Sequence, residues 1–370
     1  MSIAQVIADE AKIRALNSLS VRGLSAMFDR QCQLFCYRLV RAERGLEREG
    51  LSPRYTLMTL MGLHRGEAFG LHSPFNTKAI LNGLLKDTKW LDNIGDLGLL
   101  LWACALIEPE RFEKVYLNLN VASAIDRHRH ASEGYTMEMA WFLTGLSHGA
   151  LTSRKSISGL ACLAEKSYEI VRNNQGRNGI FGHLSQGNGV AGAFRGRLGS
   201  FADQVYPIYA FSKFSSAFAH EEALKRAQTC AETICNVQGS LGQWWWHYDS
   251  RAGRVVGKYP VYSVHQDAMA PMALFEVGEK SGKDYSASIF KGLAWVYGQN
   301  ELNYNLCENS ASIVWRCIYL SKPAAYVREA ASLFGFGTRN SVPRDLRIRF
   351  EDRPYHFGWV LYAFAKYGFE

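Results

Sequence analysis

Two short stretches of the sequence combine side chains that can exchange protons. In the first, Tyr262, His265 and Asp267 come directly before the apolar run 268–274. A histidine and a carboxylate that share one substrate hydroxyl can act as general acid and base near neutral pH. His265 and Asp267 are therefore predicted to be a catalytic pair, and the alternative is a network that caps the start of a helix.

The second stretch, FEDRPYHFGW, carries Arg353, Tyr355 and His356. Tyrosine and histidine can abstract a proton next to a carboxylate, and an arginine can neutralise that acid. Tyr355 and His356 are predicted to be catalytic and Arg353 to bind substrate. The alternative is a surface ion pair between Arg353 and Glu351 or Asp352.

Further polar and aromatic side chains lie in the first turns of apolar segments of helix length, or in the short polar stretches directly before them, here called the leads. If such segments surround one cavity, these positions face a ligand. Acidic residues at helix starts also cap the helix and complement its dipole, which is the alternative for Asp96 and Asp203. The residues predicted to bind substrate on these grounds are Tyr135, Glu138, Asp203, Tyr206 and Tyr262.

Three consecutive tryptophans, Trp244 to Trp246, lie within the stretch QGSLGQWWWHYD. Side chains alternate along an extended segment, so Trp245 is expected on the opposite side from Trp244 and Trp246. Trp244 is predicted to be structural. At least one indole is expected to face the cavity, where it could stack on a sugar, a prenyl chain or a cation, so Trp245 and Trp246 are candidate substrate-binding residues.

No cofactor and no metal site are predicted. GNGVAG (187–192) satisfies G-x-G-x-x-G, but no strand precedes it and no helix opens within it. GLSHG (145–149) satisfies G-x-S-x-G, but it is expected at a helix end rather than at a strand-to-helix turn, so Ser147 is interpreted as structural. HRH (128–130) lacks the further Cys, His or Asp ligands that zinc requires.

The elements that must position these residues recur along the chain. Seven apolar segments of helix length begin at residues 54, 95, 134, 202, 263, 309 and 353, with amphipathic segments between them. A helix that is apolar all round is buried on both sides. Alternation of buried and half-exposed helices at a long, uneven period predicts a closed ring, an all-α (α/α)6–7 toroid, rather than a solenoid.

The inner helices are expected to start near residues 95, 135, 202, 264, 309 and 354, with the segment from 54 as an extra turn or a closing element. Residues 1–370 are predicted to form one domain, with 1–50 as N-terminal helices that pack on the ring. The arginines between 22 and 48 are interpreted as a solvated helix face. At most a short β-hairpin is expected near 253–264.

Two sequence frames support the ring. Gln238, Gly242 and Trp244 form Q-x-x-x-G-x-W, and Gln175, Gly179 and Phe181 repeat the frame with phenylalanine. This frame resembles the QW element of terpenoid cyclases and related α/α toroids. The resemblance implies that the glutamine caps helix ends and that the aromatic ring packs on the junction. Sugar-active toroids, including six-hairpin glycosidases, epimerases and several polysaccharide lyases, have comparable glycine–aromatic turns.

Composition limits the partners. The formal net charge of the 370 residues is +8, which favours an anionic partner such as an acidic or phosphate-bearing sugar and leaves a membrane surface open. The basic residues are scattered, so nucleic-acid binding is disfavoured. No apolar stretch is long enough to span a bilayer, no secretory signal is visible, and the eight cysteines lack a CxxC pair, so we expect reduced thiols in a cytoplasmic protein.

Three functions are compatible with these observations. The first is a carbohydrate-active hydrolase, lyase or epimerase that acts on a glycan or sugar intermediate in intracellular polysaccharide metabolism. The second is a class II-like terpenoid cyclase, although the sequence lacks D-x-D-D and Asp267 would have to act alone. The third is a non-catalytic toroid that binds a glycan or peptide. The sequence makes no prediction of the oligomeric state.

Overall fold

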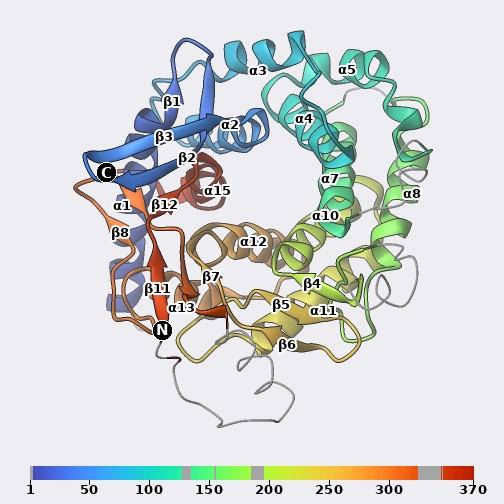
Figure 1. The fold of residues 1–370 in the computed structure, drawn as a ribbon. Helices are drawn as coiled ribbons and strands as arrows, with labels where there is room; N and C mark the ends of the chain where they lie inside the picture. Colours follow the sequence, from blue (N-terminus) through green and yellow to red (C-terminus); the bar gives the residue numbers. More distant parts are fainter. Residues whose placement is uncertain (1–2, 127–134, 154–155, 185–195, 324–342, 344) are drawn as a thin grey trace.

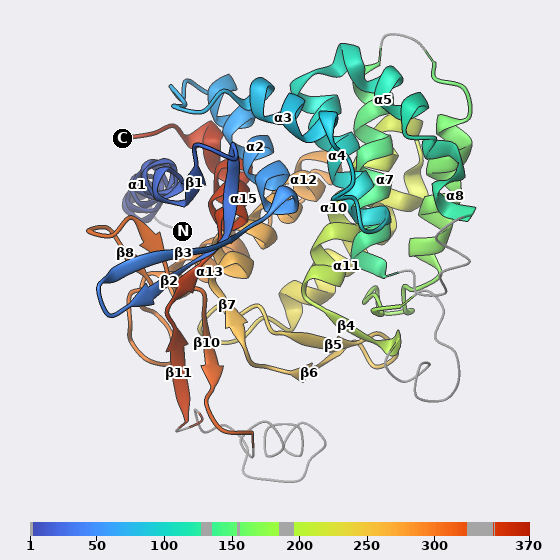
Figure 2. The same ribbon diagram turned by 45° about the horizontal axis from the view of Figure 1, so that its top comes forward.

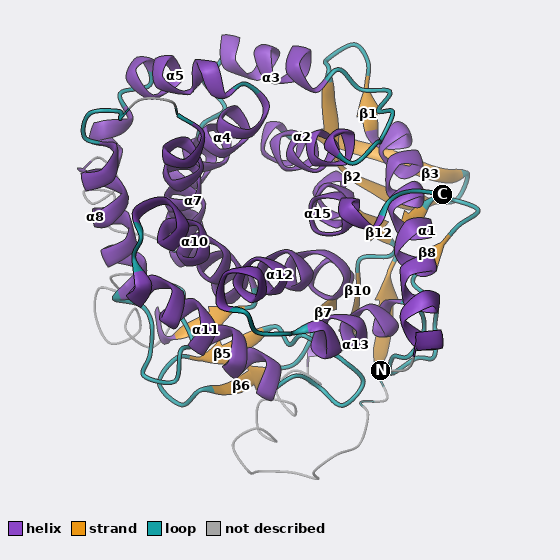
Figure 3. Cartoon of the chain, turned by 180° about the vertical axis from the view of Figure 1, so that it is seen from behind, coloured by secondary structure: helices purple, strands orange, loops and turns teal. Residues whose placement is uncertain are grey.

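Two concentric rings of helices make up most of the molecule (Figures 1 and 3). The computed structural model describes residues 3–126, 135–153, 156–184, 196–323, 343 and 345–370. Within these residues the inner ring contains α2 (Pro53–Ala68), α4 (Ile94–Ile107), α7 (Thr136–Thr152), α10 (Ala202–Phe218), α12 (Ala270–Ser281) with the preceding π-helical turn η3 (His265–Met269), and α15 (Pro354–Phe364). The outer ring contains α3 (Thr77–Lys86), α5 (Phe112–Asn118), α8 (Leu160–Arg172), α11 (Glu221–Asn236), α13 (Ser286–Val296) and α1 (Ile3–Met27).

The first helix closes the double ring, because α1 packs against α15, the last inner helix. Each of the other outer helices follows its inner partner in sequence. The predicted α/α toroid is therefore confirmed, with six hairpins. The segment from residue 54 is one of the inner helices and not an extra turn.

Burial explains which helices lie inside. All residues of α4 except Leu106 are buried, because this helix contacts both its ring neighbours and the outer layer. In α11 the buried residues recur at every third or fourth position, as on a helix with one solvated face; they are Ala223, Ala227, Cys230, Ala231 and Ile234.

Glycines allow the inner helices to approach closely. A Cβ atom on Gly62 of α2 would lie 2.0 Å from the carbonyl oxygen of Gly358 in α15. A Cβ atom on Gly145 of α7 would lie 2.4 Å from the carbonyl oxygen of Gly98 in α4. Larger residues at these positions would push neighbouring helices apart, so the glycines help to fix the diameter of the ring.

An aromatic plug fills the middle of the ring. Trp102 of α4 stacks on Trp359 of α15 and on Tyr209 of α10, with ring centroids 5.3 and 5.1 Å apart. The Tyr209 hydroxyl lies 2.6 Å from that of Tyr362 and 3.2 Å from Nε2 of His148. These five residues are buried and come from four inner helices, some on opposite sides of the ring. The interior is therefore a packed core at this level.

The predicted inner helix near 309 is wrong. Residues Cys307–Glu308 (β8) and Ile313–Val314 (β9) form a two-stranded hairpin, and Cys317–Leu320 (β10) pairs with Leu346–Arg349 (β11) and Val261–Tyr262 (β7). A short apolar run rich in β-branched and aromatic residues is compatible with a buried strand as well as with a helix. Pairing with two distant strands decides the outcome here.

The prediction of helices throughout residues 1–50 is only partly right. After α1 the chain forms β1 (Phe28–Asp29), β2 (Leu34–Ala42) and β3 (Gly45–Leu51), and β12 (Glu351–Asp352) joins this sheet. Of the arginines predicted to form one helix face, Arg38, Arg41 and Arg48 lie on the strands of this hairpin, and Arg38 pairs across it with Glu49 through Nε at 2.6 Å.

The short hairpin predicted near 253–264 is not formed, because the two strands in that range, β6 (Arg254–Gly257) and β7, belong to different sheets. β5 (His247–Asp249) pairs with β6 and with β4 (Leu198–Ser200). Figure 2 shows these strands, with β7, β10 and β11, along one end of the helical ring. Strands β3, β4, β7 and β12 each end within three residues of the start of an inner helix, so they hold the N-terminal ends of those helices.

The two glutamine frames make the same contacts. Gln175 donates from Nε2 to the carbonyl oxygens of Gly179 and Arg226, at 3.0 Å each, and Gln238 donates to those of Gly242 and Ser288, at 2.9 and 3.0 Å. Each glutamine thus fastens its own loop to the next outer helix. The aromatic residues of both frames, Phe181 and Trp244, are fully buried.

Candidate active site

The N-terminal ends of the six inner helices meet at one end of the ring. The first turn of each inner helix, or the residues directly before it, contacts the same part of the next inner helix around the whole circle. One residue pair makes this contact at each junction. The pairs are Arg54 with Asp96, Gly95 with Glu138, Met137 with Asp203, Phe201 with His265, Asp267 with His356, and Arg353 with Tyr55. Polar groups from every inner helix therefore converge here.

Glu138 differs from the other carboxylates at this end. In the part of the chain that the structure describes, its carboxyl group makes no hydrogen bond or ion pair, although the residue is half-buried. The pKa of Glu138 is raised to about 7, mainly by burial; Arg54 and His183 lower it, and Asp96 and Asp203 raise it. Such a carboxyl group can both donate and accept a proton near neutral pH.

Asp96 is held by an arginine that the sequence analysis did not single out. Arg54 donates from Nε and Nη2 to the two carboxylate oxygens, at 2.5 and 3.0 Å. The guanidinium of Arg54 also lies 6.0 Å from the ring of Trp141. This bidentate pair places a compensated charge beside Glu138.

Asp203 is fully buried and accepts four hydrogen bonds. The donors are the backbone N–H and hydroxyl of Ser200, the backbone N–H of Met137, and Nδ1 of His183, at 2.8 to 3.2 Å. These bonds agree with the capping alternative for Asp203. They also fix the His183 ring, which lies 4.9 Å from the ring of Tyr135, a predicted substrate-binding residue.

The predicted His265–Asp267 pair is not formed. Asp267 accepts from Nε2 of His356 at 2.7 Å, and Nδ1 of the same ring lies 3.1 Å from Asp352. Burial alone would lower the pKa of His356, but the two carboxylates outweigh it and raise the pKa to about 10. His356 is thus a buried cation between two carboxylates.

His265 is surrounded by aromatic rings instead. Its ring is nearly parallel to that of Trp246 at 5.9 Å and lies 5.1 Å from Tyr262 and 4.7 Å from Phe201. Burial, helped by Arg316 and His356, lowers the pKa of His265 to about 3. A neutral imidazole of this kind does not supply a general acid near pH 7.

The tryptophan run divides between core and site. Trp244 is fully buried against Phe201. Trp245 is 8% exposed and donates from Nε1 to the carbonyl oxygen of Val237, so its prediction as a substrate ligand is not supported by its surroundings. Trp246 is half-buried, packs at 4.9 Å on Tyr262 and joins the aromatic wall around His265.

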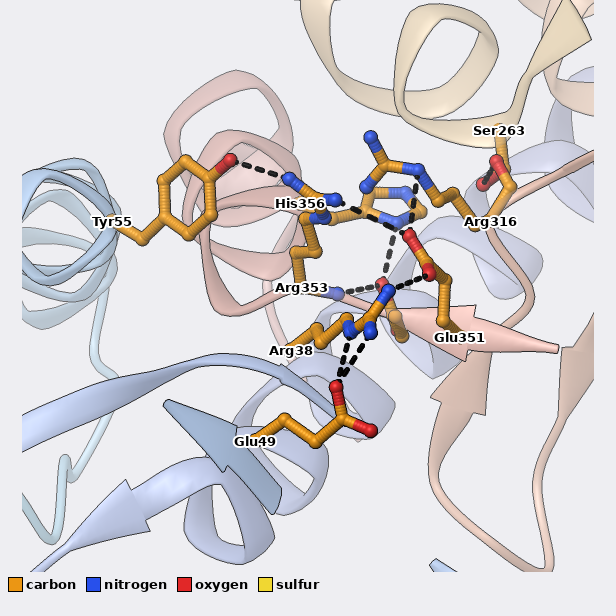
Figure 4. A network of polar contacts seen from close by, with 9 residues as sticks. Arg38, Glu49, Tyr55, Ser263, Arg316, Glu351, Arg353 and His356 are labelled. Carbon is orange, nitrogen blue, oxygen red and sulfur yellow. Dashed lines mark hydrogen bonds and ion pairs between the residues drawn. The ribbon is translucent and has the colours of Figure 1, made fainter. Parts of the chain in front are cut away.

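Arg353 and Tyr355 lie at the junction of α15 with α2. Arg353 donates from Nη1 to the Tyr55 hydroxyl at 2.6 Å (Figure 4). The rings of Tyr55 and Tyr355 are 4.6 Å apart. Burial raises the pKa of Tyr355 although Arg316 and Arg353 oppose it, which keeps the phenol protonated at neutral pH. Tyr206, by contrast, is buried and packs against Trp141 and Trp359.

The sequence analysis missed several polar residues of this end. Arg54 and Tyr55 begin the segment that was expected to be an extra turn of the ring or a closing element, and Arg38 and Arg316 lie on segments that were expected to be helical. His183 lies nineteen residues before α10 begins and contacts Asp203 from a loop. The start of the segment from 54 was the one feature of the sequence that could have identified Arg54 and Tyr55. Its polar residues precede an apolar run, as they do at the other inner helices.

Among the described residues no group of three or more His, Cys, Asp or Glu side chains could hold a metal ion. Ser147 lies inside α7 and donates to the carbonyl oxygen of Leu143, as expected of a structural residue. GNGVAG (187–192) and HRH (128–130) lie outside the described residues. No helix in the described segments is long and apolar enough to cross a membrane.

Fold and site together define an α/α toroid with polar groups at the N-terminal end of its inner ring. No protein-family model matches the sequence, and no curated protein matches it. A possible member of the GH105 family from Salmonella enterica subsp. enterica serovar Paratyphi A has a TM-score of 0.60 at 9% identity, covering 97% of this chain and 94% of that one. Unsaturated glucuronyl hydrolase from Bacillus sp. GL1 has a TM-score of 0.58 at 16% identity, covering 95% and 94%. At these identities the likeness concerns the fold.

Proposed function

We propose that this chain is a carbohydrate-active enzyme that binds a glycan or sugar intermediate at the N-terminal end of its inner ring. One observation carries the proposal: the half-buried carboxyl group of Glu138, without a hydrogen-bond partner among the described residues, has a pKa raised to about 7. In that state it can donate a proton to the oxygen that leaves when a glycosidic bond breaks. The half-buried rings of Tyr135, Trp246 and Tyr262 offer faces on which sugars stack.

Hydrolysis is the reaction that these groups favour. A lyase or an epimerase needs a strong base to remove a proton from carbon, but His356 is held between two carboxylates and the phenol of Tyr355 stays protonated. A terpenoid cyclase would need a free acid at Asp267, which is bonded to His356. Likeness in fold to a glucuronyl hydrolase supports the same choice.

The net charge of +8 supports an acidic glycan as substrate. All eight cysteines are free thiols, which supports the intracellular setting proposed from the sequence.

The test of the proposed acid is Glu138→Gln, which keeps the size of the side chain and removes the proton. Activity would be sought by release of reducing sugar from a panel of neutral and acidic oligosaccharides. On the best substrate we expect kcat to fall by roughly 10²–10⁴-fold. Glu113→Gln, which removes an exposed carboxylate on α5, is the matched control. A Glu138→Gln protein with the turnover of the control would overturn the proposal.

A further inference from the structure

Three arginines from separate parts of the chain surround one carboxylate beside the site. They are Arg38 on β2, Arg316 just before β10, and Arg353 at the start of α15, and they are called the arginine cluster below. Glu351 on β12 lies 3.0 Å from Nη1 of Arg38, 3.0 Å from Nε of Arg316 and 3.4 Å from Nη2 of Arg353 (Figure 4).

The three arginines outnumber the carboxylates that are paired with them. Arg38 is also paired with Glu49, so three positive charges face two negative ones, and the neighbouring group of His356, Asp267 and Asp352 adds one positive and two negative charges. The side chains of Arg316 and Arg353 are only 14% and 13% exposed, so water and salt screen their charges weakly. Arginine stays protonated at any pH at which the protein is folded.

The donors of the two buried arginines are not used up by the carboxylate. Nε of Arg353 is buried and has no hydrogen-bond partner within the described residues. Figure 4 shows the guanidinium of Arg316 beside that of Arg353, with its terminal nitrogen atoms turned away from Glu351. Unused donors on adjacent, weakly screened guanidinium groups attract an anion.

Tyrosine rings frame the same place. The guanidinium of Arg353 lies 4.4 Å from the ring of Tyr37 and that of Arg316 lies 4.9 Å from Tyr262. Tyr37 is exposed and Tyr262 is half-buried. One face of each ring is thus covered by a guanidinium group, and a sugar that carries an acid group would stack on a ring surface that remains exposed while its acid binds arginine.

The cluster adjoins the proposed acid. Arg353 bonds to Tyr55, the residue before Tyr55 in the chain is Arg54, and Arg54 binds Asp96 beside Glu138. We infer that the arginine cluster is a subsite for the anionic group of an acidic sugar unit, a carboxylate, a sulfate ester or a phosphate ester, next to the unit held at Glu138. The inference deepens the proposed function and rests on it.

The test compares sugars that differ only at C6. Methyl glucuronide, methyl glucoside 6-sulfate, methyl glucoside 6-phosphate and the neutral methyl glucoside would be titrated by ligand-observed NMR at constant ionic strength. We expect wild type to bind at least one acidic sugar at least tenfold more tightly than the neutral one. The order of the three anions identifies which group the subsite prefers.

Arg353→Gln should reduce that acidic-to-neutral ratio by about tenfold or more. Arg38→Gln, at the most exposed member of the cluster, should reduce it without disturbing the fold, and Arg347→Gln on β11 removes an exposed arginine as the matched control. A wild-type ratio near one, or a ratio that survives both cluster variants, would overturn the subsite. Glu138→Gln should keep the ratio and lose turnover, so failure of the proposed acid is distinguished from failure of the subsite.

Discussion

A carboxyl group near the start of an inner helix either binds its neighbours or remains available to a ligand. Asp96 is occupied by Arg54, and Asp203 by Ser200, Met137 and His183. Glu138 lies between these two, and burial holds its own proton in place, because Arg54 and His183 offset the negative charges of Asp96 and Asp203. The one carboxyl group left unoccupied can thus act as an acid because it is withdrawn from water.

This difference gives a pH dependence. The acid form of Glu138 is the active one for a proton donor, and its pKa is raised to about 7, so kcat/KM should fall as the pH rises through about 7. Rates measured between pH 5 and 9 would show an alkaline limb that Glu138→Gln lacks. A wild-type rate that stays constant from pH 6 to 9 would contradict this role.

Sequence reasoning named many of the residues that gather at the N-terminal end of the inner ring but could not assign their partners. The residues that precede the inner helices do lie together at one end of the ring. His265 and Asp267 are two residues apart, which suggested a pair, yet the π-helical turn directs Asp267 to a histidine 89 positions away. Long-range contacts of this kind, and the burial that fixes a pKa, exist only once the ring has closed.

At the scale of elements, the two glutamine frames fix how inner and outer helices join. Each frame uses a glycine with positive φ, 89° at Gly179 and 99° at Gly242, and a Cβ atom at Gly242 would lie 2.1 Å from the carbonyl oxygen of Lys291. The loop can therefore lie directly on the next outer helix, and the glutamine amide bonds to that helix.

Removal of either amide should weaken the fold and not the chemistry. Gln238→Ala and Gln175→Ala each leave two carbonyl oxygens without their donor, and we expect a loss of about 1–2 kcal/mol in the free energy of unfolding. Denaturant titration measures the loss, with Gln299→Ala, at an exposed position, as the control. If stability is unchanged while kcat per folded molecule drops, these residues belong to the site instead.

Helices were easier to predict than strands for a physical reason. The inner helices are long and apolar on all sides, so each of them can be predicted from one continuous segment of the sequence. The strands β8 to β11 are two to four residues long and depend on partners far along the chain, such as Cys317 with Arg349 and Tyr262. A short run such as SIVWRCIYL carries no information about those partners.

For the whole molecule, the contact between η3 and α15 is one of those that close the inner ring. In this contact the imidazole of His356 forms ion pairs with Asp267 and Asp352. The pKa of His356 in the folded protein, about 10, exceeds its ordinary value of 6.5. This contribution to stability is therefore complete below about pH 6.5 and is lost as the pH rises through about 10.

Thermal unfolding between pH 6 and 10 tests this expectation. Buried cysteines and tyrosines also favour unfolding at high pH, so the quantity to compare is the difference in Tm between wild type and His356→Gln. That difference should be largest near pH 6 and shrink towards pH 10. A Tm difference that is the same at every pH would mean that the imidazole of His356 is neutral in the folded protein.

The aromatic plug determines the direction from which a ligand can arrive. Trp102, Tyr209 and Trp359 meet across the axis of the ring, so no polymer can be threaded from one side of the molecule to the other. A chain that reaches Glu138 must enter and depart on the same side, at the end of the ring where the inner helices begin. The opposite end of the ring is therefore free to carry substitutions without any effect on the passage of a ligand.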